Sequence, residues 1–358
     1  MFGLFDIISK QSNFVIILGT AVVGFIIVIA GSRLSQYGDK LADVSGLSSS
    51  WIGMILLATI TSVPELASSI TASVSDAPDI GIGNVFGSNM FNMFIIAILD
   101  FLQGPGPVLL SVSATQILPA ALGILLMAIA AGGIFTATHF AESNNASGNI
   151  WGWIFSLLIL ITWIIGVYIS YKTEQTSVSD EEFTKKPSKR EKKSTITKFG
   201  ISSLIVIIMG IILIGFAKTL ASRTFSLGSL HITLGNSFVG TIIVALLTSL
   251  PELVVAISAY KIGAVNMAIA NLLGSNTFNI VLIPIMEIVT GKKSILASVE
   301  PYHIITASFA IIMTTIAIMG VVYRSRKSFF YLGWDALSIL GFYLLGTYLI
   351  FQITITVH

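Results

Sequence analysis

The chain has 358 residues, of which 54% are hydrophobic and 10% charged, and its mean hydropathy is +0.92. This composition excludes a soluble globular domain and indicates a protein that crosses a membrane many times. The net charge of +2 gives no reason to expect a nucleic-acid partner, and the absence of cysteine excludes disulfides, thiolate metal sites and a cysteine nucleophile.

A membrane-spanning helix needs about 20 mostly apolar residues. The first apolar run is long enough to span, so we interpret it as a transmembrane helix and not as a cleaved signal peptide. The predicted fold is therefore an all-α membrane protein with about ten transmembrane helices. The predicted spans are 14–33, 51–75, 79–102, 115–137, 150–171, 199–222, 235–259, 264–290, 302–323 and 332–353.

The hydrophilic segment 172–198 divides the chain into a first half, 1–171, and a second half, 199–358. We interpret this segment as a solvated linker; a role in binding lipid headgroups or in regulation is the alternative. Each half holds five predicted helices, so the second half starts from the opposite membrane face. The halves are then inverted repeats related by a pseudo-two-fold axis in the membrane plane, an arrangement typical of secondary transporters with a site near the midplane.

The lysine and arginine residues predict the orientation of the chain. Of the 19 positive residues, 14 fall in the loops after the odd-numbered spans and 5 on the other side. We therefore expect a multi-pass protein of the plasma (cytoplasmic or inner) membrane, with the central linker cytoplasmic and both termini outside.

One stretch occurs twice, once within 51–102 and once within 235–290. The first copy begins Thr61-Ser62-Val63-Pro64-Glu65 and ends Gly87-Ser88-Asn89-Met90-Phe91-Asn92, and the second runs in the same way from Thr248 to Asn279. The offset is constant (252 − 65 = 187 and 279 − 92 = 187), and 15 of 32 aligned positions are identical. This is an internal repeat. Each copy places a glutamate inside an apolar run, which by default marks a functional site.

The residues around each glutamate are hard oxygen donors. Pro64 has no N–H, so the carbonyl oxygen of Ile60 loses its helical partner. Thr61 and Ser62 lie four and three residues before Glu65, on the same helical face. The second copy repeats this set with Thr248, Ser249, Pro251 and Glu252.

The following helices add further oxygen donors. Ser88 with Asn92, and Ser275 with Asn279, are each spaced i, i+4 and share a helical face. A set of carboxylates, hydroxyls, amide oxygens and backbone carbonyls suits Ca²⁺ or Na⁺ and not Zn²⁺ or Cu. A single hydroxyl or amide in a membrane helix is typical of helix packing, and a single proline is typical of a kink. The occurrence of all these residues together, in both repeats, favours a cation site.

The two glutamates supply a charge of −2, which balances one Ca²⁺. Two carboxylates held close together in the membrane repel each other, so the site should not be both empty and ionised. It should hold one divalent ion, or two or three monovalent ions. A site that is always loaded with one ion or the other provides a physical basis for exchange.

Other polar residues receive weaker interpretations. Asp100 and Glu287 are also 187 residues apart, and we favour capping or interfacial acids over a role in ion entry. Asp76 and Asp79 are expected to be turn residues, with attraction of cations as the alternative. The four histidines form no cluster with ligand spacing, and no function is assigned to them.

The doubled Thr-Ser-x-Pro-Glu and Gly-Ser-Asn-x-x-Asn motifs resemble the α-repeats of the sodium/calcium exchangers. The resemblance implies that Glu65 and Glu252 are central Ca²⁺ ligands that Na⁺ also uses, and that Thr61 and Thr248 serve both ions. It further implies alternating access, with helices 1 and 6 sliding across a fixed core. Na⁺ ligands would come from Ser62, Ser249, Ser88 and Ser275, and backbone carbonyls from Ala58 and Ala245.

The sequence departs from the family pattern in three places. Ile60 and Leu247 stand where the family usually has glycine before the Thr-Ser pair, and Ala270 replaces the glycine of the second Gly-Asn pair. Several members carry an aspartate at the position of Asn279, so this site has two acids and not three.

The function predicted from the sequence is secondary antiport of Ca²⁺ against Na⁺ across the plasma membrane. We expect no enzymatic activity, no cofactor and no obligate protein partner, with inorganic cations and the lipid bilayer as the only partners. A Ca²⁺/H⁺ (or other divalent cation/H⁺) antiporter, in which protons neutralise the glutamates, is the first alternative. A cation channel or non-transporting membrane protein is the second, and a membrane enzyme, for which no nucleophile–base pair is present, is the third.

Overall fold

The computed structural model describes residues 7–178, 188–221, 224–227, 230–233, 246–291, 293–324, 328–329 and 332–357. These residues hold eight helices long and apolar enough to cross a membrane, together with one bent helix pair that passes the same test. The fold class predicted from the sequence, an all-α membrane protein of two inverted five-helix repeats, is confirmed. Of the predicted span 235–259, residues 235–245 lie outside the described part of the chain.

In the first half the elements are α2 (Asn13–Ser45), α3 (Ser49–Trp51), the π-helix η1 (Ile52–Leu57), α4 (Ala58–Thr61), α5 (Val63–Val74), α6 (Pro78–Gln103), the 3-10 helices η2 (Val108–Ser111) and η3 (Ala114–Gln116), α7 (Ile117–Ser143) and α8 (Asn145–Val178). In the second half they are α9 (Lys189–Ala221), the antiparallel hairpin β1 (Thr224–Leu227) and β2 (Leu230–Thr233), α11 (Leu250–Lys261), α12 (Val265–Thr290), α13 (His303–Tyr323), the short hairpin β3 (Ser328–Phe329) and β4 (Leu332–Gly333), and α14 (Trp334–Val357).

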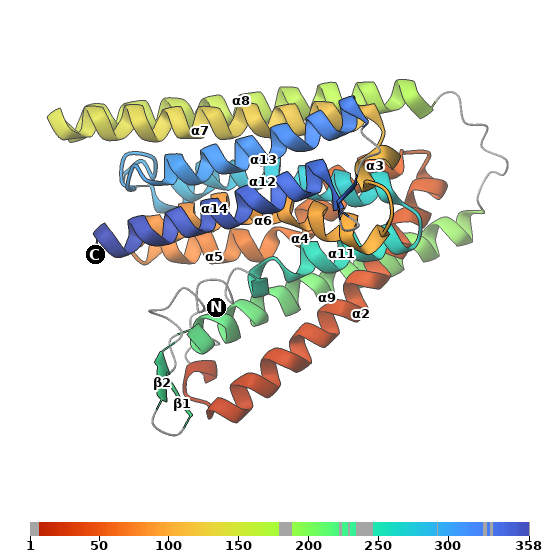
Figure 1. Ribbon diagram of the computed structural model, residues 1–358, viewed down its shortest axis with the longest axis horizontal. Helices are drawn as coiled ribbons and strands as arrows, with labels where there is room; N and C mark the ends of the chain where they lie inside the picture. Colours follow the sequence, from red (N-terminus) through yellow and green to blue (C-terminus); the bar gives the residue numbers. More distant parts are fainter. Residues whose placement is uncertain are drawn as a thin grey trace.

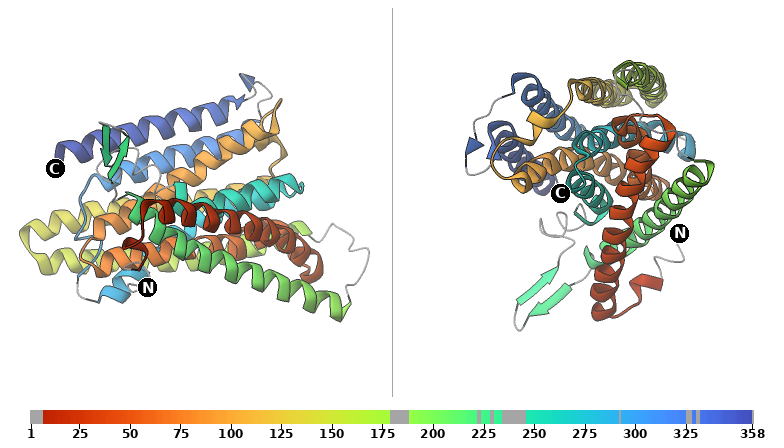
Figure 2. Two further views of the ribbon diagram at one scale, coloured as in Figure 1. Left: turned by 90° about the horizontal axis from the view of Figure 1, so that it is seen from below. Right: turned by 90° about the vertical axis from the view of Figure 1, so that its right-hand side faces the viewer.

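Helices α6 and α12 lie at the centre of the bundle. Helices α7 and α8 run side by side along one long edge, and α2 and α9 along the opposite edge (Figures 1 and 2). In the most apolar stretches of α6 and α12, 72% and 78% of the residues are buried, against 17% in α8 and in α14. Since an apolar helix face that the protein does not cover must face lipid, α8 and α14 form part of the lipid-facing surface.

The helices at the middle of the chain run further than the sequence indicates. The segment 172–198 was expected to be a solvated linker, but α8 continues to Val178 and α9 begins at Lys189, and residues 179–187 lie outside the described part. The described residues of this segment are thus largely helical and mostly exposed, and its role as a solvated linker stays a prediction. Lysine, arginine and glutamate are good helix formers, so a charged stretch can extend a membrane helix beyond the bilayer as readily as it can form a loop.

Two backbones meet where η1 packs on α12. A Cβ added to Gly53 would lie 2.5 Å from the carbonyl oxygen of Met267, and one added to Gly274 would overlap the carbonyl oxygen of Met54. Glycine at these two positions therefore permits an approach that any side chain would prevent. This contact joins the helix that leads into the first Thr-Ser-x-Pro-Glu motif to the central helix of the second half.

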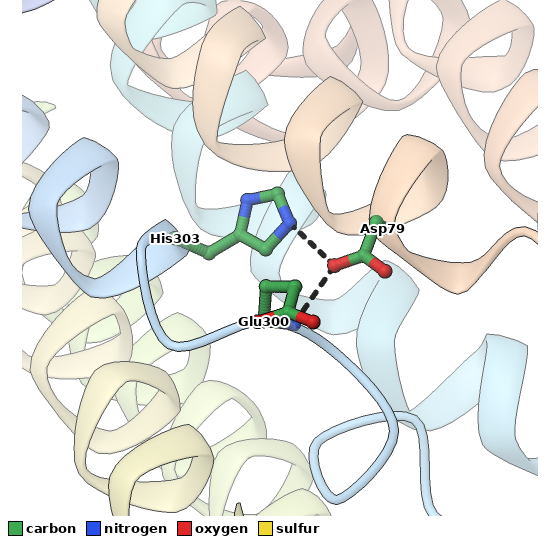
Figure 3. Close-up of polar contacts among 3 residues, drawn as sticks. All are labelled: Asp79, Glu300 and His303. Atoms are coloured by element: carbon green, nitrogen blue, oxygen red, sulfur yellow. Dashed lines mark hydrogen bonds and ion pairs between the residues drawn. The ribbon is translucent and has the colours of Figure 1, made fainter. Parts of the chain in front are cut away.

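The first turns of α6 and α12 each clasp a loop of the other half of the molecule. Asp79 accepts a hydrogen bond of 2.8 Å from the backbone N–H of Glu300 and lies 3.0 Å from Nε2 of His303 (Figure 3). Asn266 accepts a bond of 2.8 Å from the backbone N–H of Ser113. The two clasps occupy equivalent repeat positions (266 − 79 = 187 and 300 − 113 = 187). Asp79 was expected to be a turn residue, but it lies in the first helical turn of α6 and holds a loop of the second half; Asp76 does lie in a turn.

Asp100 and Glu287 hold loops in place. Both are fully buried. Asp100 accepts hydrogen bonds from the backbone N–H groups of Val108 (2.5 Å) and Gly333 (2.7 Å). Glu287 accepts a 2.6 Å bond from the Ser294 hydroxyl. Full burial rules out acids that snorkel to the interface, and the contacts give both acids a structural role in holding loops.

Candidate cation site

Each Thr-Ser-x-Pro-Glu motif breaks its helix at the serine. Ser62 (φ −91°, ψ 4°) and Ser249 (φ −93°, ψ 15°) share nearly the same non-helical backbone conformation. The helix restarts at the next residue, with proline in its first turn, where the missing N–H needs no partner. The first-half helix bends by 41° at this point. Glu65 and Glu252 consequently lie in the first turns of α5 and α11, where a helix N-terminus stabilises negative charge.

The two glutamates are buried, with 0% and 1% of their surfaces exposed. They are close enough to interact electrostatically. The Ser62 hydroxyl donates a 3.1 Å hydrogen bond to Oε1 of Glu252. The other three carboxylate oxygens, Oε1 and Oε2 of Glu65 and Oε2 of Glu252, have no hydrogen-bond partner among the described residues. Since burying a carboxylate without partners is very costly, this arrangement calls for a positive ligand.

Hydroxyl groups from both halves surround the glutamates. Oγ1 of Thr61 lies 3.5 Å from Oγ of Ser275, and both hydroxyls contact the carbonyl oxygen of Ala58, at 3.3 and 3.5 Å. On the other side of the pseudo-two-fold axis, Ser249 lies 3.5 Å from Ser88. Each hydroxyl pair joins one half to the other, and so does the bond from Ser62 to Glu252. The site is therefore shared between the repeats.

Four asparagines of α6 and α12 are bonded to one another, and two of them, Asn92 and Asn279, lie one helical turn beyond Ser88 and Ser275. Nδ2 of Asn92 donates to Oδ1 of Asn276 (2.9 Å), and Nδ2 of Asn279 donates to Oδ1 of Asn89 (3.0 Å). All four side chains are buried. Oδ1 of Asn92 and Oδ1 of Asn279 have no partner among the described residues. These two amide oxygens thus join the unpaired carboxylate oxygens as buried acceptors without a donor.

The structure therefore brings together nearly all the residues that the sequence singled out. Thr248 is buried one residue before Ser249, at the end of the helical residues 246–248, and Ala245 lies outside the described part of the chain. Pro64 and Pro251 contribute a contact surface: a Cβ added to Gly210 of α9 would overlap Pro64 and would lie 3.8 Å from Pro251. Sequence reasoning missed Asn89 and Asn276, although both stand in the repeated motif. No cluster of three or more histidine, cysteine, aspartate or glutamate side chains suited to a metal is found in the part of the chain that the structure describes.

The sodium/calcium exchanger protein family model matches residues 15–172 and 202–355, which together form most of the chain. The chain belongs to the sodium/calcium exchanger family. This exchanger is thus a multi-pass membrane protein of a transporter family, and the resemblance noted in its doubled motif is confirmed.

Several proteins are similar to this chain in sequence. The exchanger is 26% identical to the inner membrane protein YrbG of Escherichia coli over 75% of this chain and 78% of that protein. It is 24% identical to the putative antiporter CaxA of Alkalimonas amylolytica over 73% of this chain and 77% of that one. The sodium/calcium exchanger MaX1 of Methanosarcina acetivorans is 40% identical over 94 residues, 26% of either chain.

Solved structures of the sodium-calcium exchanger NCX_Mj share the fold. The form soaked with 10 mM Na⁺ and zero Ca²⁺ gives a TM-score of 0.66 at 21% identity, covering 92% of this exchanger and 98% of that chain. The form soaked with 2.5 mM Na⁺ and 10 mM Sr²⁺ gives a TM-score of 0.64 at 22% identity, with the same coverage. Identities this low establish a shared architecture and do not identify the ions that the chain binds.

Proposed function

We propose that the protein is a secondary antiporter that exchanges Ca²⁺ for Na⁺ across the plasma membrane by alternating access. The observation that supports it is the set of buried acceptors without donors: three carboxylate oxygens of Glu65 and Glu252 and the amide oxygens of Asn92 and Asn279. Hard oxygen atoms from carboxylates, amides and hydroxyls are the ligands that Ca²⁺ takes in proteins. The hydroxyls of Thr61, Thr248, Ser62, Ser249, Ser88 and Ser275 and the carbonyls of Ala58 and Ala245 are proposed as the remaining ligands.

The charge of the site determines how many cations of each kind neutralise it. Glu65 and Glu252 together carry −2 when ionised, so one Ca²⁺ neutralises them. Three Na⁺ ions would leave the loaded site at +1, and exchange at that ratio would carry net charge across the membrane. Releasing Ca²⁺ without a replacement leaves two buried charges that repel each other, which opposes the return of an empty site.

Helices α2 and α9 are proposed as the moving part. They pack along each other, and α2 touches α11 through small polar contacts: Ser32 Oγ lies 2.9 Å from Ser258 Oγ, and Ser35 Oγ donates to the carbonyl of Val255 at 2.9 Å. On α9, Gly210 faces the prolines of both broken helices. Small side chains and few specific bonds favour a surface that can slide past the site-bearing core.

A Ca²⁺/H⁺ antiporter is the second candidate. The observation that favours it is that the site has only two acids, with neutral Asn92 and Asn279 beside them, so two protons would neutralise it fully. Na⁺ coupling is favoured by the hydroxyls, because neutral oxygens at Ser88 and Ser275 serve a metal ion and add nothing to the binding of a proton.

The orientation inferred from the positive residues is also part of the proposal: the end of α8 and the start of α9 face the cytoplasm, and both termini face outside. Protease or cysteine-labelling accessibility in right-side-out vesicles tests it, and labelling of a Lys192→Cys variant from outside would contradict it.

The test of function is ⁴⁵Ca²⁺ uptake into proteoliposomes loaded with Na⁺, with a pH-gradient arm in parallel. Glu65→Gln and Glu252→Gln should each abolish uptake, whereas Glu142→Gln, an exposed glutamate at the end of α7, should leave it unchanged. Uptake that follows only the pH gradient would replace Na⁺ by H⁺ as the counter-ion. The absence of Ca²⁺ flux under either gradient would overturn both candidates.

A further inference from the structure

The centre of the α6–α12 contact is a reciprocal pair of asparagines. Nδ2 of Asn89 donates to the backbone carbonyl of Asn276 at 3.2 Å, and Nδ2 of Asn276 donates to the backbone carbonyl of Asn89 at 3.3 Å. The two residues are equivalent in the repeats (276 − 89 = 187), so the pseudo-two-fold axis passes between them. Their exposed surfaces are 0% and 1%.

This pair determines how the neighbouring amides face. A backbone carbonyl can only accept a hydrogen bond, so each asparagine of the pair must turn its Nδ2 toward the carbonyl and its Oδ1 away. Each Oδ1 then requires a donor, which is Nδ2 of Asn92 for Asn276 and Nδ2 of Asn279 for Asn89. As a result, Oδ1 of Asn92 and of Asn279 must point out of the pair, where neither meets a protein donor among the described residues.

We propose that Asn89 and Asn276 are positioning residues that present the amide oxygens of Asn92 and Asn279 to the transported cation. The four asparagines are called the amide clamp. The proposal rests on the exchange function above, since it assigns the second layer of that same site. An amide that is free to flip would offer its NH₂ group to a cation in half of its orientations, and the clamp removes that orientation at both positions.

The clamp also limits the charge of the site. Positions 92 and 279 must each donate a hydrogen bond to the Oδ1 of a clamp residue, and an ionised aspartate has no proton to donate. An aspartate at position 279 would place its charge against the acceptor Oδ1 of Asn89, which is itself held in that orientation by the carbonyl of Asn276. With the clamp intact, the site therefore stays at two carboxylates.

Double-mutant cycles on the purified full-length chain test the clamp. Asn276→Ala removes the acceptor of Asn92 but keeps the backbone carbonyl that orients Asn89, so it releases one amide selectively. If Asn276 acts through Asn92, Asn276→Ala should lower Ca²⁺ affinity by about tenfold or more, as loss of a residue that orients a metal ligand commonly does. Adding Asn276→Ala to Asn92→Ala should then cause no further loss of Ca²⁺ affinity. Asn89→Ala with Asn279→Ala should behave in the same way.

The matched control crosses the pairs. Asn92→Ala with Asn279→Ala joins two residues that donate to different asparagines of the clamp, so their effects on unfolding without Ca²⁺ should add. Thermal unfolding without Ca²⁺ is measured on the same variants, because breaking one shared hydrogen bond twice also gives a non-additive loss there. This second readout does not depend on which ion is transported.

The outcomes separate the clamp from the proposed function. Non-additive losses for the bonded pairs in both Ca²⁺ affinity and unfolding, with additive losses in unfolding for the crossed pair, support the clamp. Non-additive unfolding in a protein that binds no Ca²⁺ supports the clamp and overturns the proposed cargo. Additive losses for the bonded pairs, or a Ca²⁺ affinity that Asn276→Ala and Asn89→Ala leave unchanged, overturn the clamp even where Ca²⁺ exchange is established.

Discussion

Glu65→Gln should stabilise the cation-free protein while abolishing its response to Ca²⁺. Glu65 is fully buried, neither of its carboxylate oxygens has a partner among the described residues, and Glu252 lies close by. Two unit charges about 4 Å apart at an effective dielectric of about 20 repel each other by about 4 kcal/mol, and the repulsion falls in inverse proportion to their distance. Glutamine keeps the shape and removes this repulsion and the burial of one charge, so a gain of about 1–3 kcal/mol is expected in the absence of Ca²⁺.

The assay is thermal unfolding in detergent at neutral pH and constant ionic strength, with and without Ca²⁺. A gain of this size corresponds to a rise of several degrees in melting temperature. The unsubstituted protein should gain about 2.7 kcal/mol of stability at a Ca²⁺ concentration 100 times its dissociation constant, and Glu65→Gln should gain almost none. Glu142→Gln should match the unsubstituted protein under both conditions. A Glu65→Gln protein that melts lower without Ca²⁺ and still responds to it would refute the reasoning.

Three further predictions concern the frame of the site. Gly274→Ala places a methyl group against the backbone of η1 and should cost about 1–3 kcal/mol in thermal unfolding. Gly87→Ala, at the equivalent position of the first repeat with nothing within 4 Å, should be neutral or should stabilise by up to about 1 kcal/mol. Equal effects of the two substitutions would contradict the close approach of η1 and α12. Asp79→Asn reproduces the side chain of the other clasp and should change stability by less than about 1 kcal/mol, whereas Asp79→Ala should cost about 1–3 kcal/mol. Equal losses for the two variants would show that the carboxylate charge is what matters. Asp100→Ala leaves two buried N–H groups without an acceptor and should cost about 2–5 kcal/mol, with Glu142→Ala, which removes an exposed acid from a helix, as the control that should change little.

The sequence was sufficient to predict the centre of the molecule because the centre is duplicated. An offset of 187 residues identified Glu65 and Glu252 as equivalents, and an odd number of spans in each half implied that they meet from opposite directions. Helical spacing placed Thr61 and Ser62 beside Glu65. What spacing could not show was the partner of each group. Ser62 bonds to Glu252 and not to the glutamate of its own motif, because the inverted repeats interleave at the site.

Asn89 and Asn276 were missed for the same reason. Within one helix each is an amide three residues before another, which is commonly helix packing, and only the contact with the opposite repeat reveals that one orients the other. The helical content of the segment 172–198 was missed for a different reason. Charge density reports solvation, and a solvated stretch of lysine, arginine and glutamate can be helix or loop with little difference in free energy.

The two clasps make the two ends of the molecule chemically different. At the centre of the molecule the repeats present matching oxygens, so on the proposed function an ion arriving from either compartment would meet chemically equivalent groups. The clasps, which the inversion places toward opposite faces, have diverged: one is an aspartate with an imidazole beside it, and the other is an asparagine on a backbone amide. The two ends of the site-bearing core therefore differ in charge and in partners, although the central motifs match. A difference in apparent affinity between the two sides of the membrane should therefore be sought at these clasps, not in the ligands themselves.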